Sequence, residues 1–177
     1  MRALLFAAFV LAGCTQPASV APPASPPQAG LAALTDRADI EAVANAIDDA
    51  VDRKDWAAAR SYFTDAVDAD FSSLGGAPSK IPADELVTNW KTALPEHKAS
   101  FHLRGEAMIK LDGDRATMIS RGYAWNKLDT RADDNLWEVW GIYEHRFSRT
   151  SAGWRVSGFK FTKTYERGDP SVRAATP

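Results

Sequence analysis

The sequence predicts an α+β domain, in which helices come first along the chain and an antiparallel sheet follows. Apolar residues recur mainly at helical spacing in the first part of the domain, up to Leu94. After Pro95 they alternate with polar residues at every second position, which is typical of half-buried strands. The 177-residue chain is 45% hydrophobic and 25% charged, so one core of ordinary composition is expected.

The first helix is expected to run from a cap at Thr35 or Asp36 to about Arg53. Its length follows from a set of apolar residues that share one helical face. This face is formed by Ile40, Val43, Ala44, Ile47 and Val51.

A second helix, a short strand and a third helix are expected next. Asp55 is a good cap for a helix from Trp56 to Phe63. Alternation of apolar and acidic residues over 67–71 predicts a strand that ends at the turn sequence 72–76. Pro82 suits the first position of a third helix. The apolar face of that helix is formed by Leu86, Trp90 and Leu94.

Four longer strands are expected after Pro95, because the period-two pattern is interrupted only by turn sequences and one polar loop. Asp112-Gly113 is a hairpin signal, and residues 150–153 form the second tight connection. The expected strands span residues 101–111, 116–128, 136–149 and 154–165.

The N-terminus has the pattern of an export signal. One basic residue, Arg2, precedes the apolar run 3–12, which is too short to cross a bilayer as a helix. The sequence Leu11-Ala12-Gly13-Cys14 resembles the lipobox of bacterial lipoproteins, and the resemblance implies a lipid on Cys14 after cleavage. The alternative is an ordinary secretory signal with an incidental cysteine.

The rest of the chain divides into three parts. Residues 14–34 are rich in proline and alanine and predict a flexible tether, residues 35–167 form the domain, and residues 168–177 are expected to be a disordered tail. The lipobox resemblance implies a protein of the bacterial cell envelope that is lipid-anchored and faces the periplasm. Thr15 rather than aspartate after the cysteine favours the outer membrane.

Several classes of function are not expected. The formal net charge is −2 and no basic stripe is present, so nucleic acid is not expected as a partner. No nucleotide-binding, hydrolase or metal motif occurs, so neither a cofactor nor a metal is expected. His97, His102 and His145 are too far apart for a metal site, and His97 and His145 are expected to be solvated.

The order of these elements, with Asp52-Arg53-Lys54-Asp55-Trp56 closing the first helix and residues 149–156 in the last hairpin, resembles SnoaL-like domains. These domains belong to the nuclear transport factor 2-like superfamily. The resemblance implies a cone-shaped, strongly curved and mostly antiparallel sheet, covered by about three N-terminal helices. Members include cyclases, isomerases, dehydratases and proteins without catalysis, so the fold implies a pocket but no single reaction.

Scytalone dehydratase is similar to this chain at two site positions, which match Asp52 and His102. The resemblance implies that His102 is a general acid/base that Asp52 orients. The alternative is that His102 points outward and Asp52 only ends a helix. Asp48, Asp49 and Lys54 are expected to form a solvated helix face. Val51 and Phe71 replace tyrosines of the dehydratase, and Trp125 or Asn126 replaces a second histidine, which argues against the same reaction.

Aromatic residues are expected to line the pocket of the cone and to suit a flat, mostly apolar ligand. A solidly filled cone is the alternative, and Trp90, like Trp154, is most simply a core residue. The candidate pocket residues are Trp56, Phe71, Trp90, Tyr123, Trp125 and Tyr143.

Three functions remain open from the sequence. The first is a membrane-anchored module that binds a small apolar or aromatic ligand without catalysis. The second is a cofactor-independent dehydratase, isomerase or cyclase that uses Asp52 and His102. The third is a homodimeric interaction subunit of the cell envelope.

Overall fold

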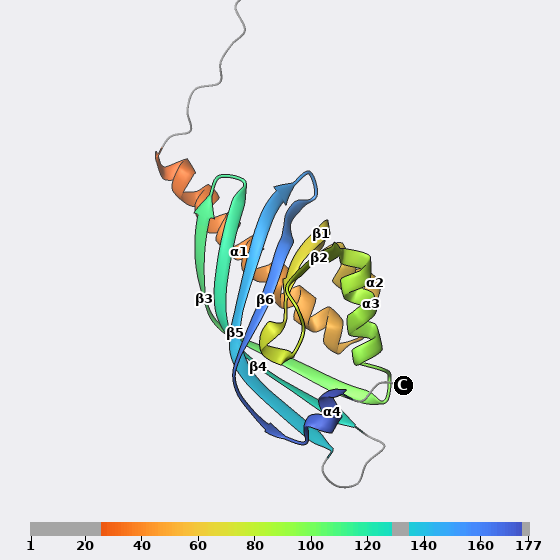
Figure 1. The fold of residues 1–177 in the computed structure, drawn as a ribbon. Helices are drawn as coiled ribbons and strands as arrows, with labels where there is room; N and C mark the ends of the chain where they lie inside the picture. The colour runs from red at the N-terminus through yellow and green to blue at the C-terminus, as the bar shows by residue number, and fades with distance from the viewer. Residues whose placement is uncertain (1–25, 129–134, 175–177) are drawn as a thin grey trace, which may run out of the picture.

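The computed structural model describes residues 26–128 and 135–174. Within these residues it has a six-stranded sheet in the order β2-β1-β6-β5-β4-β3 (Figure 1). β1 and β6 are parallel, and the other neighbouring pairs are antiparallel. The predicted α+β class and the curved, mostly antiparallel sheet are therefore confirmed.

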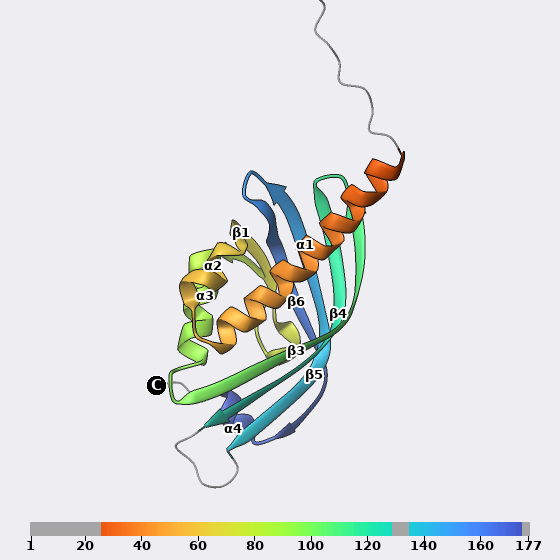
Figure 2. The same ribbon diagram turned by 180° about the vertical axis from the view of Figure 1, so that it is seen from behind.

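Helix α1 (Pro26–Asp52) crosses the inner face of the sheet (Figure 2). It begins nine residues before the predicted cap, so residues 26–34 of the predicted tether are helical. These first turns project past the end of the sheet, where Leu31 and Leu34 are 67% and 65% exposed (Figure 1). The burial pattern starts at Ile40, which explains why periodicity alone placed the start too late. The predicted signal, Cys14 and tether residues 14–25 lie outside the described residues.

Helices α2 (Trp56–Ser61) and α3 (Ala83–Ala93) flank one side of the sheet. Asp55 caps α2 as predicted, because its Oδ1 accepts a hydrogen bond from the Ala58 backbone N–H at 3.0 Å. The helix ends before the predicted Phe63, which instead begins strand β1 (Phe63–Asp70). Pro82 is the cap of α3 rather than its first residue, because it also ends strand β2 (Ser79–Pro82), which the sequence did not predict.

The four long strands are β3 (Lys98–Asp112), β4 (Arg115–Leu128), β5 (Leu136–Thr150) and β6 (Gly153–Gly168). All four were predicted, with ends that differ by at most three residues. Register shifts interrupt the ladders β3–β4 and β5–β6, and such bulges increase the local bend and twist of a sheet. The bend allows one sheet to enclose a cavity instead of a flat core.

The C-terminal segment is ordered, which corrects the predicted tail at residues 168–174. After Gly168, helix α4 (Pro170–Ala174) packs against the ends of β4 and β5 (Figure 1). Its Val172 is completely buried. One buried side chain in a short segment has no periodicity, so the sequence pattern could not indicate it.

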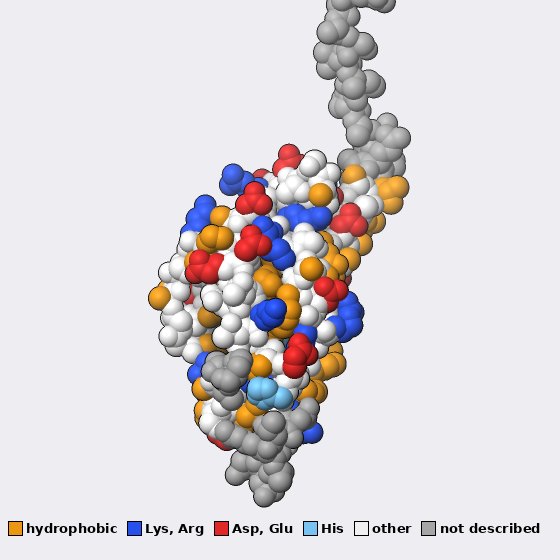
Figure 3. Space-filling model, turned by 90° about the vertical axis from the view of Figure 1, so that its right-hand side faces the viewer, with side chains coloured by type: hydrophobic (Ala, Val, Ile, Leu, Met, Phe, Trp, Pro, Cys, Tyr) orange, Lys and Arg blue, Asp and Glu red, His pale blue; other side chains and the backbone are white. Residues whose placement is uncertain are grey.

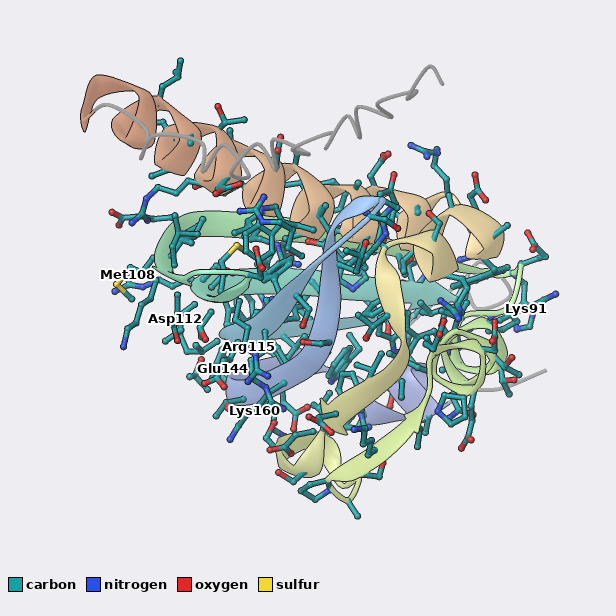
Figure 4. All side chains as sticks on the ribbon, turned by 90° about the horizontal axis from the view of Figure 1, so that it is seen from above. Lys91, Met108, Asp112, Arg115, Glu144 and Lys160 are labelled. Carbon is teal, nitrogen blue, oxygen red and sulfur yellow. The ribbon has the colours of Figure 1, made fainter. Side chains whose placement is uncertain are left out.

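The surface of the described residues mixes charges of both signs. Acidic and basic side chains are interspersed on the side that carries α2 and α3 (Figure 3). On the outer face of the sheet, Glu144 and Lys160 lie side by side across β5 and β6, far from Lys91 on α3 (Figure 4). None of the helices in the described parts of the chain is long and apolar enough to span a membrane.

Candidate active site

A cavity of about 490 Å³ lies between α1, α3, β1 and the inner face of the sheet. This volume is within the usual range of small-molecule sites. Its walls are mostly apolar and include several rings: Phe71, Trp90, Trp137, Tyr143, Phe159 and Phe161. Polar groups enter it at few positions, among them Asp48, His102, Asn126 and Arg173. A partly open, mostly apolar cavity with a few polar groups suits a small organic ligand.

His102 lines this cavity and is in direct contact with Asp52, which lies behind it. The Oδ1 atom of Asp52 is 2.7 Å from Nδ1 of His102, and Oδ2 accepts a hydrogen bond from the His102 backbone N–H at 2.7 Å. Ser100 donates a third hydrogen bond to Oδ1 at 2.9 Å. The predicted contact is confirmed, and three hydrogen bonds fix the carboxylate.

The two elements explain this geometry. Asp52 is the last residue of α1, so its side chain lies where the helix passes the edge strand β3. Ser100 and His102 alternate with exposed Phe101, so both point to the inner face of that strand. Since Nδ1 is held by the carboxylate, the neutral imidazole carries its proton there and leaves the Nε2 lone pair for a ligand.

The charges around the pair favour a protonated imidazole. Burial is the largest influence on His102 and opposes its charge, but the hydrogen bond to Asp52 and the nearby carboxylates outweigh it and raise the pKa of His102. Burial likewise opposes the charge of Asp52, yet the His102 contacts hold the pKa of Asp52 below its ordinary value. The pair therefore has the charge distribution of an imidazole that can accept a proton and be stabilised afterwards.

A second ionic pair lies one helical turn before the first. Arg104 donates from Nη2 to both oxygens of Asp48 at 2.8 and 2.7 Å, and from Nη1 to Ser120 at 3.1 Å. The arginine side chain is only 4% exposed and stacks on the Tyr143 ring at 4.5 Å. The two aspartates are four residues apart on α1, and their partners His102 and Arg104 are two residues apart on β3. Both spacings keep side chains on one face of their element, so both pairs face the same interior.

The predicted solvated face of α1 is therefore wrong at two of its three positions. Asp48 is buried against Arg104, and the Nζ atom of Lys54 is also buried. Asp49 is exposed and forms an ion pair with Arg53, so it is solvated as predicted. A helix that lies over a sheet buries the acidic residues that point toward the sheet. The charge pattern alone does not distinguish these residues from the solvated ones.

A SnoaL-like domain model matches residues 32–160, which is most of the chain. The chain belongs to the SnoaL-like domain family. A Mycobacterium bovis protein of uncharacterised role is 25% identical over 77% of this chain and 91% of its own length. Among solved structures, this SnoaL-like domain is similar to a Kribbella flavida protein, with 28% identity, a TM-score of 0.75, and coverage of 81% of this chain and 99% of the other.

A structure described as a putative dehydratase of the NTF2-like family from Streptomyces avermitilis is also similar. Its TM-score is 0.64 at 15% identity, and the match covers 74% of this chain and 98% of the other. Such a low identity shows the shared fold alone. The fold and the SnoaL-like family that the sequence resembled are thus confirmed.

Three of the six predicted pocket residues line the cavity of this SnoaL-like domain, and three do not. Phe71, Trp90 and Tyr143 line the cavity as predicted. Tyr123 and Trp125 do not, because their neighbours Ala124 and Asn126 point inward and alternate side chains of a strand point to opposite faces.

Trp56 packs against the core but is not among the cavity-lining residues. Three further rings line the cavity that the sequence pattern did not indicate: Trp137, Phe159 and Phe161. Cross-strand pairing could have indicated Phe161, since it lies opposite Tyr143.

His97 and His145 were both expected to be solvated, and the structure contradicts this for His145. His145 was expected to be solvated but is completely buried between rings, including Phe159 at 4.5 Å. Both of its nitrogens are buried and have no hydrogen-bond partner. Burial lowers the pKa of His145 well below its ordinary value, so it is neutral. His97 is half-buried in the turn before β3.

Proposed function

We propose that this chain is a cofactor-independent lyase or isomerase, in which His102 moves a proton to or from a small, mostly apolar substrate in the cavity. The observation that carries the proposal is the pair of hydrogen bonds from His102 to Asp52, which fix the ring with Nε2 available to the cavity. A module that only binds its ligand needs the cavity but not an oriented base. The dyad therefore favours the enzyme over the binding module that the sequence placed first.

The chemistry that fits these groups is elimination or a proton shift at carbon. Nε2 of His102 takes a proton from a carbon next to an electron-withdrawing group, and the C–H electron pair forms a carbon–carbon double bond. The leaving group departs with its bonding electrons, or, in an isomerase, the imidazolium returns the proton to another carbon. If hydroxide leaves, the imidazolium proton converts it to water, so the step balances without a cofactor.

The residues around the dyad set limits on the substrate. Val51 and Phe71 line the cavity at the positions that match tyrosines of scytalone dehydratase. His102 is the only histidine that lines it among the described residues. Asn126 points inward at the remaining position, while Trp125 points outward. We therefore propose the general reaction class and not scytalone itself as substrate.

Turnover with matched histidine variants tests the proposal. A panel of cyclic β-hydroxyketones is followed by the absorbance of the conjugated ketone that elimination produces. His102→Gln should lose turnover while it keeps the fold, whereas His97→Gln, altered outside the cavity wall, should retain it. Because only neutral His102 can act as a base, kcat/KM should rise with pH and level off above its pKa. Equal turnover of His102→Gln and wild type contradicts the proposal.

We also propose that Cys14 carries a lipid that holds the chain on the periplasmic side of a membrane, with the outer membrane as the favoured location. The lipobox residues support this proposal. Cys14→Ser should lose the lipid mass by intact mass spectrometry and leave the membrane fraction. A variant that keeps the mass increment and the membrane association contradicts the anchor.

We also propose that the chain forms a homodimer through the outer face of the sheet. Leu103, Tyr123, Trp140 and Tyr165 are register neighbours on four adjacent strands and form a continuous row. Leu103 and Tyr165 are 56% and 58% exposed, and exposed apolar patches of this kind mark interaction surfaces. Native mass spectrometry should show a dimer that Trp140→Glu dissociates, and a monomeric wild type contradicts it.

A further inference from the structure

The cavity lining includes one cation, Arg173, that forms no ion pair among the described residues. The carboxylate of Asp48 is paired with Arg104, and His102 is paired with Asp52. Arg173, by contrast, donates from Nη1 to the backbone carbonyl of Leu74 at 3.1 Å and forms no ion pair in the described structure. The two pairs cancel their own charges, and Glu166, the carboxylate that Arg173 affects, is itself ion-paired with Lys163. Arg173 is therefore the lining cation that is available for a ligand anion.

The position of Arg173 is fixed by the C-terminal segment. Val172 is completely buried, which anchors α4 at the mouth of the cavity. The buried Lys98 donates from Nζ to the backbone carbonyls of Arg173 at 3.2 Å and of Ala93 at 2.8 Å. The guanidinium lies 5.8 Å from the centre of the Trp137 ring, another lining residue. Arg173 is exposed to solvent, but these contacts hold its backbone and its guanidinium beside the cavity.

We propose that Arg173 binds a carboxylate of the substrate, so that the cavity takes an organic acid with an apolar body. This inference rests on the proposed function, because the acid is the molecule on which His102 acts. A planar guanidinium with free N–H groups matches a carboxylate in two-point geometry. One unbalanced guanidinium also matches a single negative charge. The apolar rings between Arg173 and His102 then hold the body of the acid.

A pair of probes of equal shape tests this assignment. Binding of 1-naphthoate and of the neutral 1-naphthamide to the purified chain is followed by quenching of tryptophan fluorescence, since Trp90 and Trp137 line the cavity. Hydrogen bonds to charged groups contribute more than neutral ones, so wild type should bind the acid about tenfold more tightly than the amide. Added salt should weaken the binding of naphthoate and leave naphthamide unchanged.

Variants of two arginines separate the site from a general charge effect. Arg173→Gln should lose the preference for the acid and retain its affinity for the amide, while Arg173→Lys should keep part of the preference. Arg121→Gln removes an exposed arginine on the outer face of the sheet and should behave as wild type. Thermal unfolding of each variant checks that α4 remains packed.

The outcomes distinguish this inference from the proposed function. Equal binding of both probes by wild type, or an unchanged preference in Arg173→Gln, overturns the role of Arg173 and leaves the dyad intact. If neither probe binds wild type, the inference about Arg173 fails, and turnover of the histidine variants decides the proposed function separately. If the preference holds while His102→Gln turns over substrate normally, the acid site stands and the catalytic role of His102 does not.

Discussion

Breaking the buried ion pair of Asp48 and Arg104 should strongly lower the free energy of unfolding. Their side chains are 12% and 4% exposed and joined by two hydrogen bonds of 2.8 and 2.7 Å. Arg104→Met leaves the Asp48 carboxylate buried without its partner, and breaking such pairs costs about 3–5 kcal/mol. Because Asp48 also lines the cavity and can gain water there, the lower end of the range, about 3 kcal/mol, is expected.

The double variant Asp48→Leu/Arg104→Met separates the worth of the pair from the cost of an unpaired charge. Replacing both members by apolar side chains avoids burying a charge and is often neutral or stabilising. Its free energy of unfolding should therefore lie within about 1 kcal/mol of wild type, well above that of the single variant. The hydroxyl of Ser120 loses one hydrogen bond in both variants, so it does not affect the comparison.

Urea unfolding of the three proteins, followed by circular dichroism, measures these differences. Equal slopes with denaturant concentration are required, so that a shift of the midpoint reports stability. A single variant that loses less than about 1 kcal/mol would show that water reaches Asp48 and that the pair behaves as a surface ion pair.

Three further predictions follow from individual side chains. His145→Leu removes two unpaired buried nitrogens and should stabilise the domain by about 1 kcal/mol at neutral pH. This stabilisation should grow as the pH falls below about 6.5, because His145 is protonated in the unfolded wild type but stays neutral when it is buried in the folded state. A stabilisation that does not change with pH in urea unfolding argues against this. Gly122→Ala should cost about 1–3 kcal/mol or displace Tyr143, since the new Cβ would lie 2.1 Å from Cε2 of that ring; a neutral change in the melting temperature contradicts the packing. Removal of residues 1–31 should leave the melting temperature unchanged because Leu31 is 67% exposed, and a clear decrease would mean that this segment packs on the domain.

The strands could be predicted from the sequence, but the faces of the sheet could not. Period-two alternation places two sets of side chains on opposite faces and does not say which set is inside. On β4 the large rings Tyr123 and Trp125 suggested the inner wall, yet the inward neighbours of Tyr123, Gly122 and Ala124, are small. Gly122 is small because the Tyr143 ring occupies the space above it. The inner wall is therefore built from rings on neighbouring strands.

The candidate site was predictable where a family resemblance supplied the positions. Asp52 and His102 were found in this way, because their separation in sequence is too large for a local pattern. Asp48 and Arg173 were not predicted as site residues. Their environment depends on Arg104 across the interior and on the packing of the C-terminal segment, which are contacts between distant parts of the chain.

Titration of His102 tests the central claim of an oriented, proton-accepting imidazole most directly. Nitrogen-15 NMR across the pH range reports both its pKa and the nitrogen that carries the proton. In wild type the pKa should lie above the ordinary value of His, and the neutral ring should hold its proton on Nδ1, which faces Asp52. In Asp52→Asn the loss of the anion should lower the pKa of His102, because burial is then opposed only by the more distant Asp48. An unchanged titration in Asp52→Asn, or a neutral ring protonated on Nε2 in wild type, would contradict the account.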